Sequence, residues 1–274
     1  MINSGKKFRQ TLPESRRIVV KIGSRVIVRK SGRPDTAQIR MIVEQIASLR
    51  RDGYEVVIVS SGAIAAGMEA LDIASRPAAV PDLQMCAAVG QGRLMSCYAE
   101  LFAKRKLLTG QILLTHADFD SKIRLANMRR TMDHILARGI VPIINENDAV
   151  ADEEVKADLS FGDNDNLASL VTRQTRADLL VILSTVNGLR SFSENGASRR
   201  IPYVETVNRE ILRLVRAPDA GGISKGGMDS KLKAASVCMK SGSNVVVADG
   251  RRKDVLTRIV AGEDEGTLFI GASF

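Results

Sequence analysis

Short apolar segments rich in β-branched residues recur along this chain, and stretches with helical periodicity separate them. The apolar segments are RIVVKIG (17–23), EVVIV (55–59), GQILLT (110–115), IVPIIN (140–145), DLLVILS (178–184) and NVVVAD (244–249). Continuous apolar strands are typical of a sheet that is covered on both faces, and alternating helices are typical of parallel connections. The chain is therefore predicted to have an α/β fold with a mainly parallel central sheet.

The helical stretches carry recognisable boundary signals. Apolar residues recur at helical spacing from Ile39 to Leu49, with Asp35 before them and Gly53 after them at a position suited to a helix C-cap. A second helix is predicted over 83–106. Further helices are predicted over 123–139, 166–177 and 228–242. Residues 191–222 show no clear pattern.

Length and composition indicate an ordinary globular protein. The 274 residues are 45% hydrophobic and 26% charged. We interpret residues 17–274 as a single domain and residues 1–16 as a mobile polar leader, since this leader lacks the apolar core of a signal peptide. Nothing in the sequence approaches the roughly 20 apolar residues of a transmembrane helix, so no membrane partner is expected.

Charge and rare residue types narrow the class of ligand. The net charge of +9 favours an anionic partner, but only 4% of residues are aromatic and tryptophan is absent, which disfavours nucleic acid and favours a small anionic molecule. Three cysteines without CxxC spacing indicate reduced thiols and a cytoplasmic protein. With two histidines in the chain, a zinc site or a Ser-His-Asp triad is not expected.

Polar residues follow several of the predicted strands. These residues are Lys21, Ser60–Ser61, Asn145–Asp148 and Ser184–Thr185. Ligands of open parallel sheets bind beyond the carboxyl ends of the strands, so these residues are expected to meet at one edge, and the Asp163–Asn166 block could join them. A structural alternative stays open, because Asp163 or Asn164 could simply cap the following helix.

Gly-rich turns before helices suit phosphate binding through backbone amides and the helix dipole. However, the chain has no Walker A motif, no protein-kinase motif set and no GxGxxG after its first strand. The sequence therefore favours a phosphate-binding site that uses lysines and carboxylates and that lacks these common motifs.

Several motifs then make the chain recognisable. It resembles the glutamate 5-kinases of the amino-acid kinase family through VVKIGS, VIVSSGAIAAGMEAL, AAVGQGRLM, GQILLT, IVPIINENDAV, GDNDNLA, KGGMDSKLKAA and a final GTLF, in the family's order. The combination of INENDAV with GDNDN is the most specific part. The resemblance implies a three-layer αβα sandwich around the sheet and ATP-dependent phosphorylation of the L-glutamate γ-carboxylate, the first step of proline synthesis. It also implies feedback inhibition by proline, a homo-oligomer, and the next enzyme of the pathway as a partner.

The resemblance also implies roles for individual residues. Catalytic roles fall to Lys21, Asp165 and Lys231, with the carboxylate orienting both lysines. Glutamate would be bound by Ser61, Asp148 and Asn164, with Asp148 holding the substrate ammonium. ATP would be bound by Lys21, Ser184, Thr185, Lys225, Gly226, Gly227, Met228, Asp229, Ser230 and Lys231. Mg²⁺ is expected to arrive with the ATP phosphates, and no protein metal ligands are assigned.

The chain departs from the family pattern at two positions. Thr185 stands where relatives commonly carry an acidic residue, which puts ribose contacts in doubt. Lys225 replaces a usually neutral residue, and it either contacts phosphate or faces solvent. The chain also ends after GTLFIGASF, which implies a kinase-only form without the C-terminal PUA domain of many bacterial relatives.

Two other functions compete with glutamate phosphorylation. The protein could phosphorylate another amino-acid carboxylate, although Asp148 argues against an N-acetylated substrate. It could also be a catalytically silent amino-acid sensor, although the presence of Lys21, Asp165 and Lys231 argues against that function.

Overall fold

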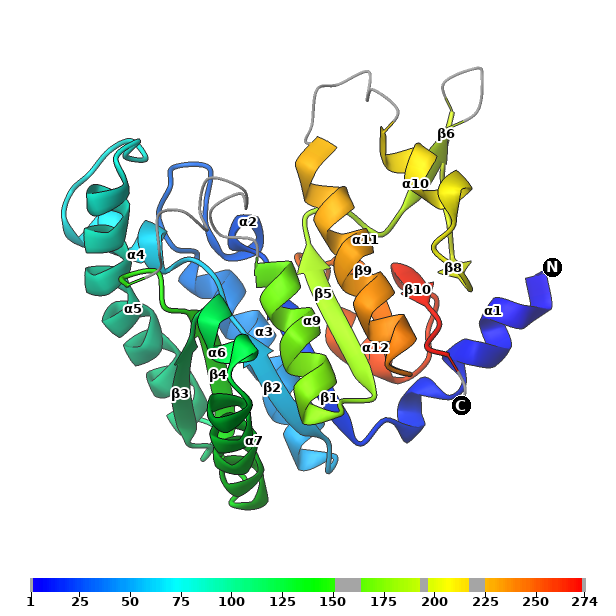
Figure 1. Ribbon diagram of the computed structural model, residues 1–274, viewed down its shortest axis with the longest axis horizontal. Helices are drawn as coiled ribbons and strands as arrows, with labels where there is room; N and C mark the ends of the chain where they lie inside the picture. Colours follow the sequence, from blue (N-terminus) through cyan, green and yellow to red (C-terminus); the bar gives the residue numbers. More distant parts are fainter. Residues whose placement is uncertain (1, 151–163, 193–196, 217–224, 273–274) are drawn as a thin grey trace.

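A mainly parallel sheet forms the centre of the molecule (Figure 1). The computed structural model describes residues 2–150, 164–192, 197–216 and 225–272. Within these residues the sheet has eight strands, which pair in the order β3 (Thr109–Leu114), β4 (Val141–Glu146), β2 (Glu55–Val59), β1 (Arg17–Ile22), β5 (Leu179–Ser184), β9 (Asn244–Asp249), β10 (Thr267–Phe269) and β8 (Tyr203–Val204). The strands from β3 to β9 in this order are all parallel, whereas β10 runs antiparallel to β9.

Helices cover both faces of the sheet (Figure 1). One face packs against α3 (Thr36–Arg51), α5 (Val80–Ala103) and α12 (Val255–Val260), and the other packs against α7 (Lys122–Ala137), α9 (Asn164–Thr175) and α11 (Lys225–Lys240). The remaining elements are α1 (Ile2–Arg9), the 3₁₀ turn η1 (Leu12–Glu14), α2 (Ser24–Ile27), α4 (Ala63–Ala70), α6 (His116–Asp120), α10 (Arg209–Arg216) and the small ribbon of β6 (Arg190–Phe192) and β7 (Ser198–Arg200). The predicted αβα sandwich is confirmed.

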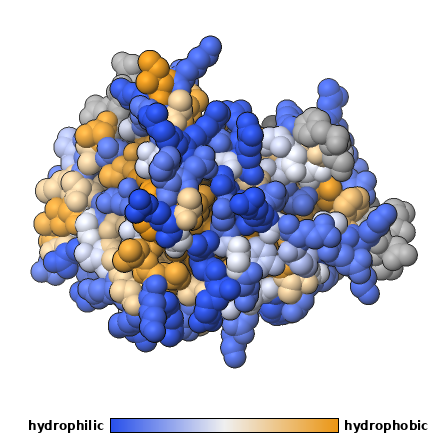
Figure 2. All heavy atoms as spheres, turned by 90° about the horizontal axis from the view of Figure 1, so that it is seen from below, coloured by the Kyte–Doolittle hydropathy of each residue, from blue (hydrophilic) through white to orange (hydrophobic). Residues whose placement is uncertain are grey.

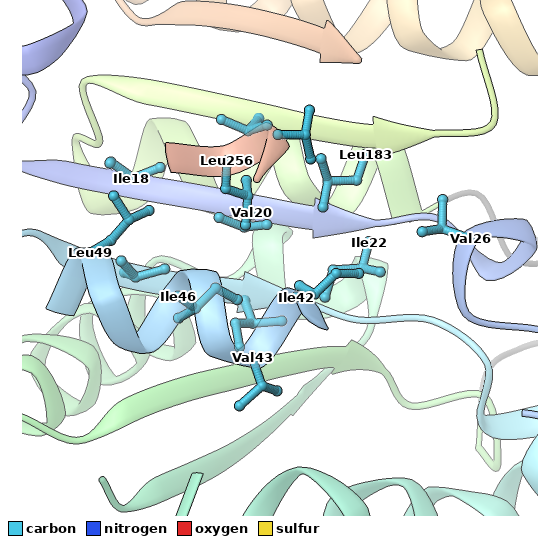
Figure 3. Close-up of a cluster of buried hydrophobic side chains, with 14 of the residues drawn as sticks. Ile18, Val20, Ile22, Val26, Ile42, Val43, Ile46, Leu49, Leu183 and Leu256 are labelled. Atoms are coloured by element: carbon cyan, nitrogen blue, oxygen red, sulfur yellow. The ribbon is translucent and has the colours of Figure 1, made fainter. Parts of the chain in front are cut away.

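The central strand β1 divides its side chains between two cores. Ile18, Val20 and Ile22 are fully buried and point toward α3 and α12, as Figure 3 shows. Val19 belongs to the core on the opposite face, with side chains of α7, α9 and α11. Because successive side chains of a strand alternate between faces, Lys21 must lie on the same face as Val19. The strand pattern thus places a lysine against α9 and α11.

Helix α3 shows why the predicted boundaries form. The Asp35 side chain accepts a hydrogen bond from the Gln38 backbone N–H (3.2 Å), which satisfies one of the free amides of the first turn. Ile39, Ile42 and Ile46 are buried on one face of the helix. Gly53 follows with a φ of +94°, a left-handed conformation that glycine adopts without strain.

The N-terminal segment differs from the prediction of a mobile leader over 1–16. Leu12 is fully buried in the core, and the Arg9 guanidinium donates hydrogen bonds to the carbonyl oxygens of Pro202, Glu265 and Gly266 (2.8–3.1 Å). These contacts attach the end of α1 to the C-terminal part of the domain. Within the predicted leader, the part that begins at Arg9 is therefore attached to the fold. The polar composition of the leader gives no sign of this packing, because the packing depends on residues about 250 positions away in the chain.

The segment over 191–222, which showed no clear pattern, contains short elements in its described part. These are the β6–β7 ribbon, β8 and α10. Strands of two or three residues are too short to give a readable alternation.

The surface is mainly polar around this core. On the face drawn in Figure 2, hydrophilic side chains surround smaller groups of hydrophobic ones. Among the residues that the structure describes, no helix has both the length and the apolar character needed to cross a membrane.

Candidate active site

The predicted polar residues meet beyond the carboxyl ends of the parallel strands. Lys21 lies near the end of β1, Ser60 follows β2, Asn145 lies near the end of β4, and α9 begins at Asn164. Contacts between their side chains, given below, join these segments, which lie up to about 140 positions apart in the sequence. The prediction that polar clusters converge at one edge is confirmed for Lys21, Ser60–Ser61, Asn145 and the start of α9.

One buried carboxylate lies between two lysines. The Asp165 Oδ1 atom lies 2.5 Å from the Lys21 Nζ atom, and its Oδ2 atom lies 3.0 Å from the Lys231 Nζ atom. The Ser230 hydroxyl also donates to Oδ2 (2.9 Å), and Lys231 donates to the Gly227 carbonyl oxygen (2.7 Å). The exposed fractions of the three charged residues are 5% for Lys21, 1% for Asp165 and 9% for Lys231. The predicted placement of Asp165 between the lysines is present in the structure.

The electrostatics of this cluster favour binding of an anion. Burial acts to raise the pKa of Asp165, but the neighbouring Lys21 and Lys231 ammonium groups outweigh burial and lower this pKa to about 2. The carboxylate is therefore ionised at neutral pH. Two lysines share it, so among the described residues the cluster holds more cationic than anionic groups in a place that water reaches poorly. Buried charge of this kind calls for a compensating partner, and phosphate is suitable.

A second buried cluster consists of uncharged polar groups. The Asn164 Nδ2 group donates to the Ser60 carbonyl oxygen (2.5 Å), to the Ser61 hydroxyl (3.2 Å) and to Asn145 Oδ1 (2.9 Å). These four residues are at most 6% exposed. The alternative in which the Asn164 side chain merely caps α9 does not match these contacts, because its amide group reaches across to the β2 and β4 ends. Asp163 lies outside the described residues.

Helix α5 supports this cluster from behind. The Tyr98 hydroxyl lies 3.0 Å from the Ser60 hydroxyl, and both side chains are fully buried. Burial raises the pKa of Tyr98, so the phenol stays protonated. Gln91, about two helical turns before Tyr98 on the same face of α5, accepts a hydrogen bond from Asn145 Nδ2 (2.8 Å). The sequence interpretation assigned no role to either side chain, since an isolated polar residue within an apolar helical pattern gives no signal.

Close helix packing fixes the turn between β2 and α4. Gly62 has a φ of +96° at the start of α4, a conformation that favours glycine. Further along, Gly67 of α4 and Gly90 of α5 bring the two helices together: a Cβ atom on Gly90 would lie 1.9 Å from the Ala63 carbonyl oxygen. The α4–α5 contact therefore holds the backbone beside Ser61.

We expect Gly90→Ala to destabilise the protein by about 1–3 kcal/mol, because the added methyl group forces the two helices apart. Gly92→Ala is the matched control, since a Cβ atom there meets nothing within 4 Å and alanine stabilises a helix by roughly 0.5–1 kcal/mol relative to glycine. Urea denaturation of both variants measures the difference. Equal stability of the two variants would contradict the close packing.

The predicted nucleotide-binding residues occupy two places. Ser184 ends β5 beside Asp249 of β9, and the Thr185 carbonyl oxygen accepts a hydrogen bond from Arg251 Nη2 (2.8 Å). Arg251 is in turn held by Asp249 (2.8 Å), so the segment after β5 is anchored to the segment after β9.

The second place is the segment 225–231, which forms the first turns of α11 rather than a loop. Asp229 pairs with Lys233 of its own helix (2.8 Å), and Gly227 and Met228 are partly buried in the same turns. The Lys225 side chain lies outside the described residues, so the alternatives of phosphate contact and solvent exposure for Lys225 both stay predictions. Asp148 lies in the turn after β4 and is partly buried.

A sequence profile of the amino acid kinase family matches residues 16–249. The chain belongs to the amino acid kinase family. A family relative from Pelobacter propionicus, named glutamate 5-kinase, is 42% identical over 264 residues, which cover 96% of this chain and 69% of the relative. Another glutamate 5-kinase, from Clostridium acetobutylicum, is 41% identical over 272 residues, which cover 98% of each chain.

Solved structures of other kinases have the same fold. Carbamate kinase from Giardia lamblia bound to AMP-PNP has a TM-score of 0.63 at 17% identity and covers 95% of this amino acid kinase and 100% of its own chain. UMP kinase from Bacillus anthracis has a TM-score of 0.61 at 14% identity, and the match covers 94% of this chain and 97% of the UMP kinase chain. At such low identity these structures support the fold of this family member and nothing finer.

Proposed function

We propose that this amino acid kinase transfers the γ-phosphoryl group of ATP to the γ-carboxylate of L-glutamate. In this reaction a carboxylate oxygen forms a bond to the γ-phosphorus, the bond from that phosphorus to the bridging β–γ oxygen breaks, and ADP leaves with γ-glutamyl phosphate as the other product. The observation that carries the phosphoryl-transfer part is the buried cationic cluster at the sheet edge. The relatives named glutamate 5-kinase support the choice of substrate.

The buried lysines suit this chemistry. Phosphoryl transfer is catalysed mainly by positioning the reactants and by neutralising charge on the transferred group. Lys21 from β1 and Lys231 from α11 would contact that group from two elements, and Asp165 would hold both ammonium groups in place. The glutamate carboxylate is already a nucleophile, so the reaction needs no strong base. The small number of histidines is therefore no obstacle.

Magnesium fits as a companion of the nucleotide. Mg²⁺ keeps few protein ligands when it binds with substrate phosphates, which supply most of its oxygen ligands and whose charge it would neutralise. Among the described residues, no group of three or more His, Cys, Asp or Glu side chains is arranged to hold a metal ion. The ends of β5 and β9 and the first turns of α11 would hold the ATP molecule itself.

Several further assignments belong to the same proposal. The enzyme acts in the cytoplasm, proline inhibits it, and it assembles as a homo-oligomer. An acyl phosphate is labile in water, which favours direct use by the next enzyme of proline synthesis. Inhibition by proline, the homo-oligomer and the next enzyme rest on the resemblance to the glutamate 5-kinases, whereas the cytoplasmic location rests on the cysteine pattern.

The test is an assay with ATP, Mg²⁺ and L-glutamate in the presence of hydroxylamine. The proposal expects glutamate-dependent ADP release together with γ-glutamyl hydroxamate. Turnover with N-acetylglutamate or aspartate and not with glutamate would instead identify a kinase for another carboxylate. Glutamate binding with no ADP release would identify an amino-acid sensor.

Asp148→Ala should raise the KM for glutamate by roughly 30-fold or more with little change in ATP binding, because losing the partner of a desolvated charge costs at least about 2 kcal/mol. Val150→Ala is the control, since Val150 lies in the same segment after β4 and its side chain is 67% exposed. Steady-state kinetics with each substrate varied separately measure the effect. An unchanged glutamate KM would exclude Asp148 as the residue that holds the substrate ammonium.

A further inference from the structure

A relay of three side-chain amides runs from helix α5 to the first residue of helix α9. Gln91 Oε1 accepts a hydrogen bond from Asn145 Nδ2 (2.8 Å), and Asn145 Oδ1 accepts one from Asn164 Nδ2 (2.9 Å). Asn145 and Asn164 are 2% and 4% exposed, whereas Gln91 is partly exposed. Asn145, in the middle of the relay, therefore presents its oxygen to Asn164 and its nitrogen to Gln91.

The orientation of the last amide is forced by its surroundings. The Ser60 carbonyl oxygen can only accept a hydrogen bond, and it lies 2.5 Å from the Asn164 side chain. The Nδ2 group must therefore face Ser60. Nδ2 and Oδ1 lie on opposite sides of the planar amide, so Oδ1 points away from Ser60, Ser61 and Asn145.

The same reasoning fixes the other two amides in turn. Asn145 must offer Oδ1 to the Asn164 nitrogen, which leaves Asn145 Nδ2 pointing toward α5. Gln91 must then present its oxygen, because two facing amide nitrogens would repel. Only an acceptor at position 91 is compatible with the observed orientation of Asn145.

The outcome is a buried carbonyl oxygen that needs a donor. Within the part of the chain that the structure describes, Asn164 Oδ1 is buried and has no hydrogen-bond partner. A buried acceptor of this kind is costly unless a donor satisfies it. An ammonium group offers three donors, whereas a carboxylate offers none at neutral pH.

We propose that Gln91 is a positioning residue for substrate selection, which acts through Asn145 to hold the Asn164 carbonyl oxygen toward the α-ammonium of the substrate. The inference deepens the proposed function and rests on it. Gln91 itself does not contact the substrate. The Ser60 carbonyl oxygen sets which end of the Asn164 amide the substrate meets. Gln91 keeps Asn145 Oδ1 on Asn164 Nδ2 and so holds this amide in the position from which its oxygen favours an amino acid over a dicarboxylate that lacks the amine.

The experiment is a series of substitutions at position 91 that changes only what the side chain offers to Asn145. Gln91→Glu keeps an acceptor, Gln91→Met offers no donor and only a weak thioether acceptor, and Gln91→Lys offers only donors. Ser96→Ala is the control on the same helix, because Ser96 is exposed and bonds only to the Gly92 carbonyl oxygen among the described residues. All variants are compared by thermal unfolding before kinetics.

The expected result is a graded rise in the KM for glutamate, with kcat nearly constant. We expect Gln91→Glu to stay within about threefold of the wild type, Gln91→Met to show about a tenfold rise, which is the scale of one hydrogen bond to a charged group, and Gln91→Lys a larger one. Discrimination between glutamate and glutarate, which lacks the amine, should fall in the same order. Ser96→Ala should change neither quantity.

Failure of the inference and failure of the proposed function give different results. A wild-type enzyme that forms no γ-glutamyl hydroxamate would contradict the proposed function and, with it, the inference. A wild-type enzyme that turns over glutamate while Gln91→Lys keeps its KM and its discrimination against glutarate overturns the inference alone. Because the Glu and Lys variants both carry charged, partly exposed side chains, a comparison between them remains decisive even if Gln91→Met fails to fold.

Discussion

Replacing Lys21 or Lys231 by alanine is expected to lower kcat by about a hundredfold or more, the scale observed when one preorganised donor is removed from an active site. Each ammonium group lies within 3.0 Å of Asp165 and is almost fully buried, so it is already positioned before substrate binds. Charge on the transferred phosphoryl group is redistributed in the transition state. Stabilisation specific to that state appears in kcat rather than in KM.

The matched control is Lys233→Ala. Lys233 lies on the same helix as Lys231, but its side chain is 76% exposed and pairs with Asp229. An exposed pair of this kind contributes roughly 0–1 kcal/mol, so kcat and stability should both stay near the wild-type values. If Lys231→Ala and Lys233→Ala had the same kcat, Lys231 would have no catalytic role.

The sequence was sufficient to predict the layers of the fold and the meeting of the polar groups. Both follow from local rules: continuous apolar strands are covered on two faces, and parallel strands place their carboxyl ends together. The alternation along β1 also determines that Lys21 faces the opposite core from Val20. These features need no knowledge of distant contacts.

Other features depend on tertiary contacts that leave no local pattern. Arg9 is buried only because the carbonyl oxygens of Glu265 and Gly266 approach it from the other end of the chain. Gln91 and Tyr98 face the site because the glycines of α4 and α5 allow the two helices to pack closely. In the sequence, such residues are indistinguishable from ordinary helix positions.

Asp165→Asn should also lower kcat by about a hundredfold while the protein remains folded. The substitution keeps the shape of the side chain but removes the charge that holds both lysines, and removing one partner from a buried ion pair leaves uncompensated charge. The variant should lose kcat more than ATP affinity, because ATP phosphates can still attract the displaced lysines. Single-turnover measurements at saturating ATP and glutamate separate the two effects.

The stability of Asp165→Asn should depend on pH differently from the stability of the wild type. The folded-state pKa of Asp165 is lowered to about 2, against about 3.9 in an unfolded chain. Its ionised form therefore stabilises the wild type fully above about pH 4, and this contribution is lost as the pH falls toward 2. Asparagine does not titrate. The stability difference between wild type and Asp165→Asn should narrow as the pH falls from 5 to 3 in urea denaturation.

A purely structural role for Asp165 makes the opposite prediction. Asp165 is in the first turn of α9, where an acidic side chain also interacts favourably with the helix dipole by about 0.3–1 kcal/mol. Asparagine stabilises a helix start about as well through hydrogen bonds, so Asp165→Asn would then be almost silent. The observed contacts favour the organising role, because both carboxylate oxygens face lysines from other elements. A near-wild-type kcat for Asp165→Asn would leave only the contribution to the helix start.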